Sequence, residues 1–397
     1  MGKIKSIIIV CLAICCPFLA GSQTTAGGYI REAALLTAGA ELHMSDTGKP
    51  SASSTEQSAS TAEPPASSSS SGSSTEESRS SSTSTTTASS ASSTSSEDIP
   101  ANNPVIPQQK RGTVIVQNRS EYRDTADYSQ YTEHSGAIIR CNFGKFTSEQ
   151  YINLESGAQV RNCTDVLNST LENAAVKTPE LDINTDEPNV LIYHTHTSES
   201  FLPEADWYDR NYPLRSSDPE RSIVAVGDAI CEALAERGIS SVHDCTIHDD
   251  PYTGSYYRSA ETILKTLEKY PSIKVVIDVH RDGIGNGDGS LPAPVATIDG
   301  KNAAQFMIIS CCESEMFDMP NYLENFKLAC LIQNCAEERY PSLARPILFD
   351  YRNYNQSLST GALLIEVGSH GNSLEEAVYS GQLVGNALAD AIYKIAG

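Results

Sequence analysis

The segment NVLIYHTHTSES, residues 189–200, decides how the rest of the sequence is interpreted. Its apolar run ends abruptly in two histidines, His194 and His196, and Glu199 follows three positions after the second. A short apolar run without alternation is typical of a strand buried on both faces of a parallel sheet. The polar residues at its end fit either a set of metal ligands or an ordinary loop after a buried strand.

The sequence from residue 186 onward repeats this pattern. Short apolar runs recur, and helix-length stretches separate most of them, which predicts a mostly parallel sheet with helices on both faces. The predicted strands are 189–193, 240–243, 274–279, 305–310, 346–349 and 362–367, and the predicted helices are 221–237, 257–269, 321–339 and 373–396. We therefore predict one α/β domain over residues 186–397, in which 190–193, 275–279 and 362–366 are neighbouring, mostly parallel strands.

Residues 104–185 form a less regular stretch ahead of that domain. The segments GTVIVQN at 112–118 and GAIIRCNF at 136–143 predict short strands, and a helix fits within 147–176. We predict a small mixed N-terminal region here. At the other end of the chain, Asn372 is the expected N-cap of the last helix.

The first hundred residues have the composition of a leader and a tether. Residues 51–97 contain 31 Ser or Thr in 47 positions and no large apolar residue, which predicts a disordered tether over 23–103. Residues 1–22 place Lys3 and Lys5 before an apolar run, as a secretory signal does. That run is shorter than the ~20 residues of a spanning helix, so a cleaved signal and a retained membrane anchor both remain open. Either one predicts an extracytoplasmic protein, membrane-anchored or secreted.

Charge and cysteine content argue against two other classes of protein. The formal net charge of −22 provides no basic surface for nucleic acid. Three of the eleven cysteines lie within the leader, and the other eight contain no C-x-x-C pair. The cysteines therefore predict neither a zinc ribbon nor a disulfide framework.

Polar residues also end two other predicted strands. VVIDV is followed by His280 and Arg281, and ALLI is followed by Glu366. In an open parallel sheet, ligands bind beyond the carboxyl ends of the strands. Each residue alone is more often a loop, cap or surface group. Together with the polar residues of 194–199, however, they favour a metallohydrolase, because two histidines and a carboxylate form the shell of catalytic zinc and a further glutamate serves as base.

Four segments at these residues carry a resemblance to a known family. VLIYHTHTSESF at 190–201, GSYYRSAETI at 254–263, VVIDVHRDGI at 275–284 and YNQSLSTGALLIEVGSHGNSLEEA at 354–377 closely resemble the stage II sporulation protein P family of endospore-forming Firmicutes. The resemblance covers roughly residues 187–397. This family is in turn similar, more distantly, to the zinc-dependent N-acetylmuramoyl-L-alanine amidases, which share an α/β fold.

The resemblance implies an activity, a cofactor and partners. It implies an exported, Zn²⁺-dependent peptidoglycan hydrolase that cleaves the N-acetylmuramoyl-L-alanine amide bond during spore engulfment, with an added endopeptidase action on peptide cross-links. Sporulation proteins D and M are the implied protein partners, and the N-terminal segment would contact the membrane. The alternative is a non-catalytic wall-binding or scaffold protein that uses the amidase fold.

The resemblance also implies roles for particular residues. The first and second zinc histidines of the amidases fall on His196 and His280, and the late catalytic glutamate falls on Glu366. The sporulation family favours Glu199 as the middle zinc ligand, whereas the amidase pattern favours Glu220, and we choose Glu199.

Two neighbouring residues complete the prediction of the site. His194 should point away from the site, because alternate residues of a strand face opposite sides. Arg281 is the candidate residue for binding substrate.

Overall fold

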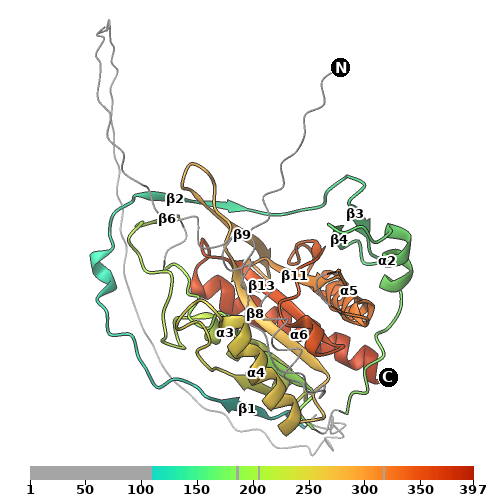
Figure 1. Ribbon diagram of the computed structural model, residues 1–397. Helices are drawn as coiled ribbons and strands as arrows, with labels where there is room; N and C mark the ends of the chain where they lie inside the picture. Colours follow the sequence, from blue (N-terminus) through green and yellow to red (C-terminus); the bar gives the residue numbers. More distant parts are fainter. Residues whose placement is uncertain (1–109, 185–186, 204–205, 316–317) are drawn as a thin grey trace, which may run out of the picture. The chain divides into compact units, whose positions relative to one another are not determined.

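The computed structural model describes residues 110–397, apart from 185–186, 204–205 and 316–317. These residues form a nine-stranded sheet and a four-stranded sheet, with helices packed on the larger one (Figure 1). The predicted leader at 1–22 and tether at 23–103 lie outside the described residues. Among the helices that are described, none combines the length and the apolar character needed to cross a membrane.

Three parallel neighbours form the centre of the large sheet. Strand β5 (Val190–Tyr193) pairs with β8 (Val275–Asp282), and β8 pairs with β13 (Ala362–Ser369). The register sets Val190 opposite Val275 and Leu363 opposite Ile277. The predicted adjacency of these three strands is confirmed.

The large sheet as a whole is mixed. Its order is β1-β7-β5-β8-β13-β11-β12-β4-β3, and only the β13–β11 and β4–β3 pairs are antiparallel. The mostly parallel sheet was therefore predicted correctly, but the reversal at β11 was not. The remaining strands are β1 (Val114–Gln117), β3 (Tyr151–Asn153), β4 (Gln159–Asn162), β7 (Ser241–Asp244), β11 (Phe306–Cys311) and β12 (Ile347–Asp350).

Helices cover both faces of this sheet, as predicted. Val190 and Ile192 of β5 pack in the main core with α3 (Ile223–Glu236), α5 (Tyr322–Arg339) and α6 (Leu374–Ala396). Leu191 and Tyr193 belong to a second cluster with α4 (Ser255–Lys269). Successive side chains of a strand point to opposite faces, so an apolar run without alternation serves two cores at once. The short α2 (Asn168–Ala175) contributes Leu171 to the main core.

The cap of α6 is Ser373, one residue after the predicted Asn372. The Ser373 hydroxyl accepts from the Glu376 N–H, and the Glu376 carboxylate accepts from the Ser373 N–H, which makes a capping box. Such a cap stabilises a helix by about 1 kcal/mol. Asn372 is buried instead, and its amide donates to the Glu376 carboxylate.

The four-stranded sheet contains elements that the sequence analysis did not foresee. Strands β9 (Leu291–Ile298) and β10 (Lys301–Ala304) form a hairpin, and Asp299 and Gly300 turn it with φ of 50° and 76°. Both positive φ values match the type I′ turn of a two-residue hairpin. The sheet is completed by β2 (Gly136–Cys141) and β6 (Trp207–Tyr208), and short 3-10 helices cover Tyr128–Gln130 and Gln356–Leu358.

The two strands predicted before residue 185 are both present. β1 joins the edge of the large sheet next to β7, and β2 joins the small sheet. Strands from 110–184 thus lie in both sheets beside strands from later in the chain. The division into separate regions at residue 185 stays a prediction.

Candidate metal and catalytic site

Four predicted residues gather near the carboxyl ends of β5, β8 and β13. Nδ1 of His280 lies 3.5 Å from Oε2 of Glu199. The rings of His196 and His280 are 5.2 Å apart, centre to centre, and nearly perpendicular at 85°. Glu366 stands opposite His280 in the register of β13 and β8. Three segments far apart in the sequence therefore supply one cluster of two imidazoles and two carboxylates.

Backbone hydrogen bonds hold Glu199 in place. Its N–H donates to the His196 carbonyl at 3.1 Å, which closes a tight turn after β5. Its carbonyl accepts from the N–H of Ile223, the first residue of α3, at 2.7 Å. Its carboxylate accepts from the backbone N–H of Arg281 at 3.1 Å. The guanidinium of Arg281 donates to the Leu214 carbonyl at 2.8 Å, and its role with substrate stays a prediction.

Asp278 supports His280 from behind and was missed by the sequence reasoning. Its Oδ1 lies 2.8 Å from Nε2 of His280, although the angle is not that of a hydrogen bond. The same carboxylate accepts from the N–H and the hydroxyl of Thr195, at 2.8 and 2.7 Å. A carboxylate behind a ligating histidine is a common arrangement in metal sites, and the signal was available in the spacing D-x-H of VVIDVH.

The charges around His280 favour a cation. Burial lowers the pKa of His280, but Asp278 and Glu199 outweigh burial and hold the pKa well above its ordinary value. Burial raises the pKa of Glu199, yet the hydrogen bond and charge of His280 bring that pKa well below its usual range. Two buried carboxylates thus flank one imidazole, so the position stabilises positive charge.

His196 is buried and neutral. Burial lowers the pKa of its imidazole to about 3, so a nitrogen lone pair is available at neutral pH. Tyr252 stacks on the ring at 4.5 Å and 15°, and the Arg215 guanidinium lies 4.6 Å from the centre of the Tyr252 ring. Arg215 in turn forms an ion pair with Asp249 at 2.7 Å. This stack covers one side of the candidate site, and no motif in the sequence pointed to it.

Glu366 has the properties of a group that can exchange a proton near neutrality. Burial raises its pKa to about 8, Asp282 adds to this effect, and His280 opposes it. The residue keeps some solvent exposure, but its Oε2 is buried and has no hydrogen-bond partner among the described residues. An unsatisfied buried oxygen beside the His280 imidazole is costly in a site that serves no ligand.

Two residues that were considered for the site lie elsewhere. Glu220 is a surface residue whose side chain is 64% exposed, and it pairs with Arg123 at 3.0 Å. His194 is fully buried and points away, as predicted: Nδ1 lies 2.9 Å from the Val279 carbonyl and Nε2 lies 3.0 Å from Nε2 of His243. The geometry therefore groups Glu199, and not Glu220, with the two other proposed ligands.

The cluster has the donor types of a metal site but not its spacing. Over 110–397, outside the three short gaps, no group of three His, Cys, Asp or Glu side chains has the spacing to hold one. The donor types nevertheless fit zinc, with a neutral His196, an ionised Glu199, and a His280 backed by a carboxylate. The surplus of buried carboxylates around His280 also fits a divalent cation.

The fold and this cluster define an α/β protein with an acid–imidazole site at the ends of its central parallel strands. The model of the family described as stage II sporulation protein P (SpoIIP) matches residues 31–392. The chain belongs to this family. It is 30% identical over 237 residues to stage II sporulation protein P of Bacillus subtilis (strain 168), an alignment that covers 56% of this chain and 54% of that protein. The chain thus matches about half the length of this relative.

Solved structures of N-acetylmuramoyl-L-alanine amidases are also similar to the chain. The amidase AmiC2 of Nostoc punctiforme is 15% identical with a TM-score of 0.31, over 52% of this chain and 96% of that structure. The CwlD amidase of Clostridioides difficile, solved with the GerS lipoprotein, is 10% identical with a TM-score of 0.32, over 52% and 98%.

Proposed function

We propose that this chain is an exported, zinc-dependent peptidoglycan hydrolase that cleaves the amide bond between N-acetylmuramic acid and L-alanine. The observation that carries the proposal is the meeting of His196, Glu199, His280 and Glu366 at one edge of the sheet. Amide hydrolysis needs an activated water, a base and protonation of the leaving amine, and these residue types serve those needs. Membership of the sporulation family supports a role on the cell wall.

His196, Glu199 and His280 are the residues that would hold zinc. When bound, zinc supplies Lewis acidity, which polarises a carbonyl and acidifies water. The Asp278 carboxylate lies 2.8 Å from Nε2 of His280, and Nδ1 of the same ring lies toward Glu199. The Arg281 N–H fixes the orientation of the Glu199 carboxylate. These supporting contacts restrict the ligand side chains before any ion arrives.

Glu366 is the proposed general base and acid. In its ionised form it takes a proton from the attacking water as the new C–O bond forms at the carbonyl carbon. It then gives that proton to the departing nitrogen as the C–N bond breaks. The products are the lactyl carboxyl group of muramic acid and the free amine of L-alanine. A raised pKa makes the Glu366 carboxylate a stronger proton acceptor than an ordinary carboxylate.

The wider parts of the proposal follow from the family resemblance. We include cleavage of peptide cross-links as a second activity, spore engulfment as the setting, and sporulation proteins D and M as partners. The N-terminal segment would act as a secretion signal or a membrane anchor.

The proposal is tested by digesting purified cell wall with the full chain and identifying the released ends by mass spectrometry. Free muramyl lactyl groups paired with free L-alanine amines are the expected products, and new termini within the cross-links would add the endopeptidase activity. The matched control is Glu220→Gln, which alters an exposed glutamate. Wall binding without any released ends, with Glu366→Gln behaving as the unaltered chain does, would point to the scaffold alternative.

A further inference from the structure

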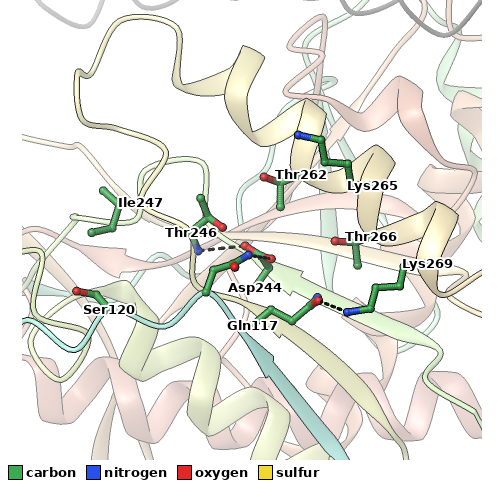
Figure 2. A pocket seen from close by; sticks show the side chains of 10 residues that line it. Gln117, Ser120, Asp244, Thr246, Ile247, Thr262, Lys265, Thr266 and Lys269 are labelled. Atoms are coloured by element: carbon green, nitrogen blue, oxygen red, sulfur yellow. Dashed lines mark hydrogen bonds between the residues drawn. The ribbon is translucent and has the colours of Figure 1, made fainter.

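A cavity of about 620 Å³, lined mostly by residues of polar type, lies beyond the ends of β1 and β7, next to α4 (Figure 2). Gln117 and Asp244 line it from the strand ends, Thr246 from the following loop, and Lys265 and Lys269 from α4. A volume of this size is within the range of ligand pockets in proteins. The carboxyl end of a parallel strand is also where α/β proteins bind ligands.

The charged residues that line the cavity give it a net positive charge. Asp244 is buried, and its carboxylate already accepts from the Asn118 amide at 2.9 Å and from the Thr246 N–H at 3.0 Å. Lys265 and Lys269 stand one helical turn apart on α4. Lys265 makes only a 3.5 Å contact with the exposed Glu261, which is worth little. In a chain of net charge −22, two ammonium groups over one cavity select for an anion.

The neutral groups of the cavity are those that bind a peptide. Lys269 donates to Oε1 of Gln117 at 3.0 Å, while Nε2 of Gln117 is buried and has no hydrogen-bond partner among the described residues. Hydroxyl groups of Thr262 and Thr266 add donors and acceptors. No aromatic ring occurs among the described residues that line the cavity, so it offers no stacking surface for a sugar.

The cavity lies within a short peptide's length of the candidate site. The first residue of α4, Ser255, has its hydroxyl 3.4 Å from Nδ1 of His196. Lys265 and Lys269 stand ten and fourteen residues further along the helix, which corresponds to about 15 and 21 Å. An extended peptide of about four to six residues spans that range. The Thr197 hydroxyl also donates to the Thr246 carbonyl at 2.7 Å, which joins the wall of the cavity to the turn of the site.

We propose that this cavity binds a free carboxylate of the peptidoglycan stem peptide. The identity of the ligand rests on the proposed function, whereas the preference for an anionic peptide rests on the cavity itself. In this arrangement Lys265 and Lys269 receive the carboxylate, and the Gln117 side chain turns so that its amide donates to a peptide carbonyl. The cavity would thus bind stem peptides with a free carboxylate more tightly than those without one.

The test uses calorimetry of the full chain with the synthetic stem tripeptide L-alanyl-γ-D-glutamyl-meso-diaminopimelate, which lacks the muramyl bond. The double variant Lys265→Gln with Lys269→Gln should bind the tripeptide at least tenfold more weakly than the unaltered chain. Added salt screens the lysine charges and should reduce this difference in affinity. The control is Lys177→Gln with Lys274→Gln, which removes the same charge elsewhere and should leave binding unchanged. Thermal unfolding of both double variants verifies that they fold.

Three outcomes would overturn the proposal. The first is that the two double variants bind the tripeptide with equal affinity. The second is that the unaltered chain binds a tripeptide with amidated carboxylates as tightly as the tripeptide with free ones. The third is that inorganic phosphate displaces the tripeptide at a lower concentration than the tripeptide itself needs to bind. The last would indicate a phosphate site. Lysine-dependent binding by a chain that releases no wall fragments would defeat the proposed function alone. Wall hydrolysis with an unchanged KM in the lysine variant, together with unchanged tripeptide binding, would defeat only this proposal.

Discussion

His194 and His196 stand two positions apart, and the structure gives them opposite surroundings. His194 has both ring nitrogens engaged, by the Val279 carbonyl and by His243, in a chain that continues to Asp228 and Arg119. His196 makes one 3.4 Å contact with the Ser255 hydroxyl and otherwise lies among aromatic rings and the candidate site. Burial is the same for both, so burial does not distinguish a structural histidine from a functional one.

The hydrogen bonds of the His194 network leave no place for a ligand. Nδ1 of His194 faces a carbonyl and must donate to it, so Nε2 carries a lone pair. Nε2 of His243 is its partner at 3.0 Å, and Nδ1 of His243 lies 3.0 Å from Oδ1 of Asp228. Every nitrogen in this network has a partner, whereas the Glu366 cluster keeps an oxygen without one. Unsatisfied groups, rather than histidine content, separate the two regions.

The largest expected effect comes from removing a proposed zinc ligand. His196→Ala or His280→Ala should lose bound zinc and all measurable wall hydrolysis, because two donors do not retain the ion. His194→Asn alters the His194 network and no proposed ligand, so this variant should retain zinc, as measured by elemental analysis of the purified proteins. If His194→Asn strips the metal and His196→Ala keeps it, the assignment of the two histidines is reversed.

Glu366→Gln should slow hydrolysis without releasing zinc. The variant keeps the ligands, so zinc content should equal that of the unaltered chain, while the hydrolysis rate should fall roughly 10²–10⁴-fold through loss of the proton acceptor. Glu199→Gln should instead release zinc. A Glu220→Gln variant that loses zinc while Glu199→Gln retains it would favour the amidase pattern for the middle ligand.

Gly227 packs against the network of His194 and His243, so a larger residue at this position tests how tightly that network is packed. A Cβ at this position of α3 would meet Nε2 of His243 at 2.5 Å and Nε2 of His194 at 2.7 Å. Gly227→Ala should therefore cost about 1–3 kcal/mol of unfolding free energy, as overpacked cores do. Gly287→Ala, where a Cβ meets nothing within 4 Å, is the control for denaturant unfolding. Equal stability of the two variants would mean that the network has room to adjust.

The smallest effect is a pH dependence that comes from His248. Burial lowers the pKa of this imidazole below its ordinary 6.5, so the unfolded chain takes up a proton there more readily than the folded chain does. Stability should fall as pH drops below about 6.5, by at most about 1.4 kcal/mol per pH unit from this group. Denaturant unfolding from pH 8 to 5 should show a shallower fall for His248→Gln. An equal slope in both chains would contradict this assignment.

Much of the fold could be predicted because the pattern of the sequence is local. The predicted strands of the central sheet and helices α3 to α6 lie within three residues of the predicted bounds, since apolar runs, caps and glycines mark them. The antiparallel β11 could not be predicted, because strand direction depends on connections and not on composition. The hairpin of β9 and β10 carried a signal, the dipeptide Asp299-Gly300, but prolines in β9 obscured its pattern.

The candidate site was predictable at the strand ends and not elsewhere. His280 and Glu366 follow directly from apolar runs, so their place at one sheet edge follows from topology. Tyr252 and Arg215 come from loops, whose position over His196 depends on the whole fold. His243 and Asp228 belong to different elements and meet only in three dimensions, so no local spacing reveals them.

The pairing of β1 has a mechanical consequence. This strand of four residues is at the edge of the large sheet and is held on one side only, by β7. Its neighbouring backbone bonds join Gly112 to the end of α3 and Thr113 to Ser241. Tension that enters the folded part of the chain through Lys110 therefore acts on β1 and its bonds to β7 and α3, and it reaches the central strands β5, β8 and β13 through β7.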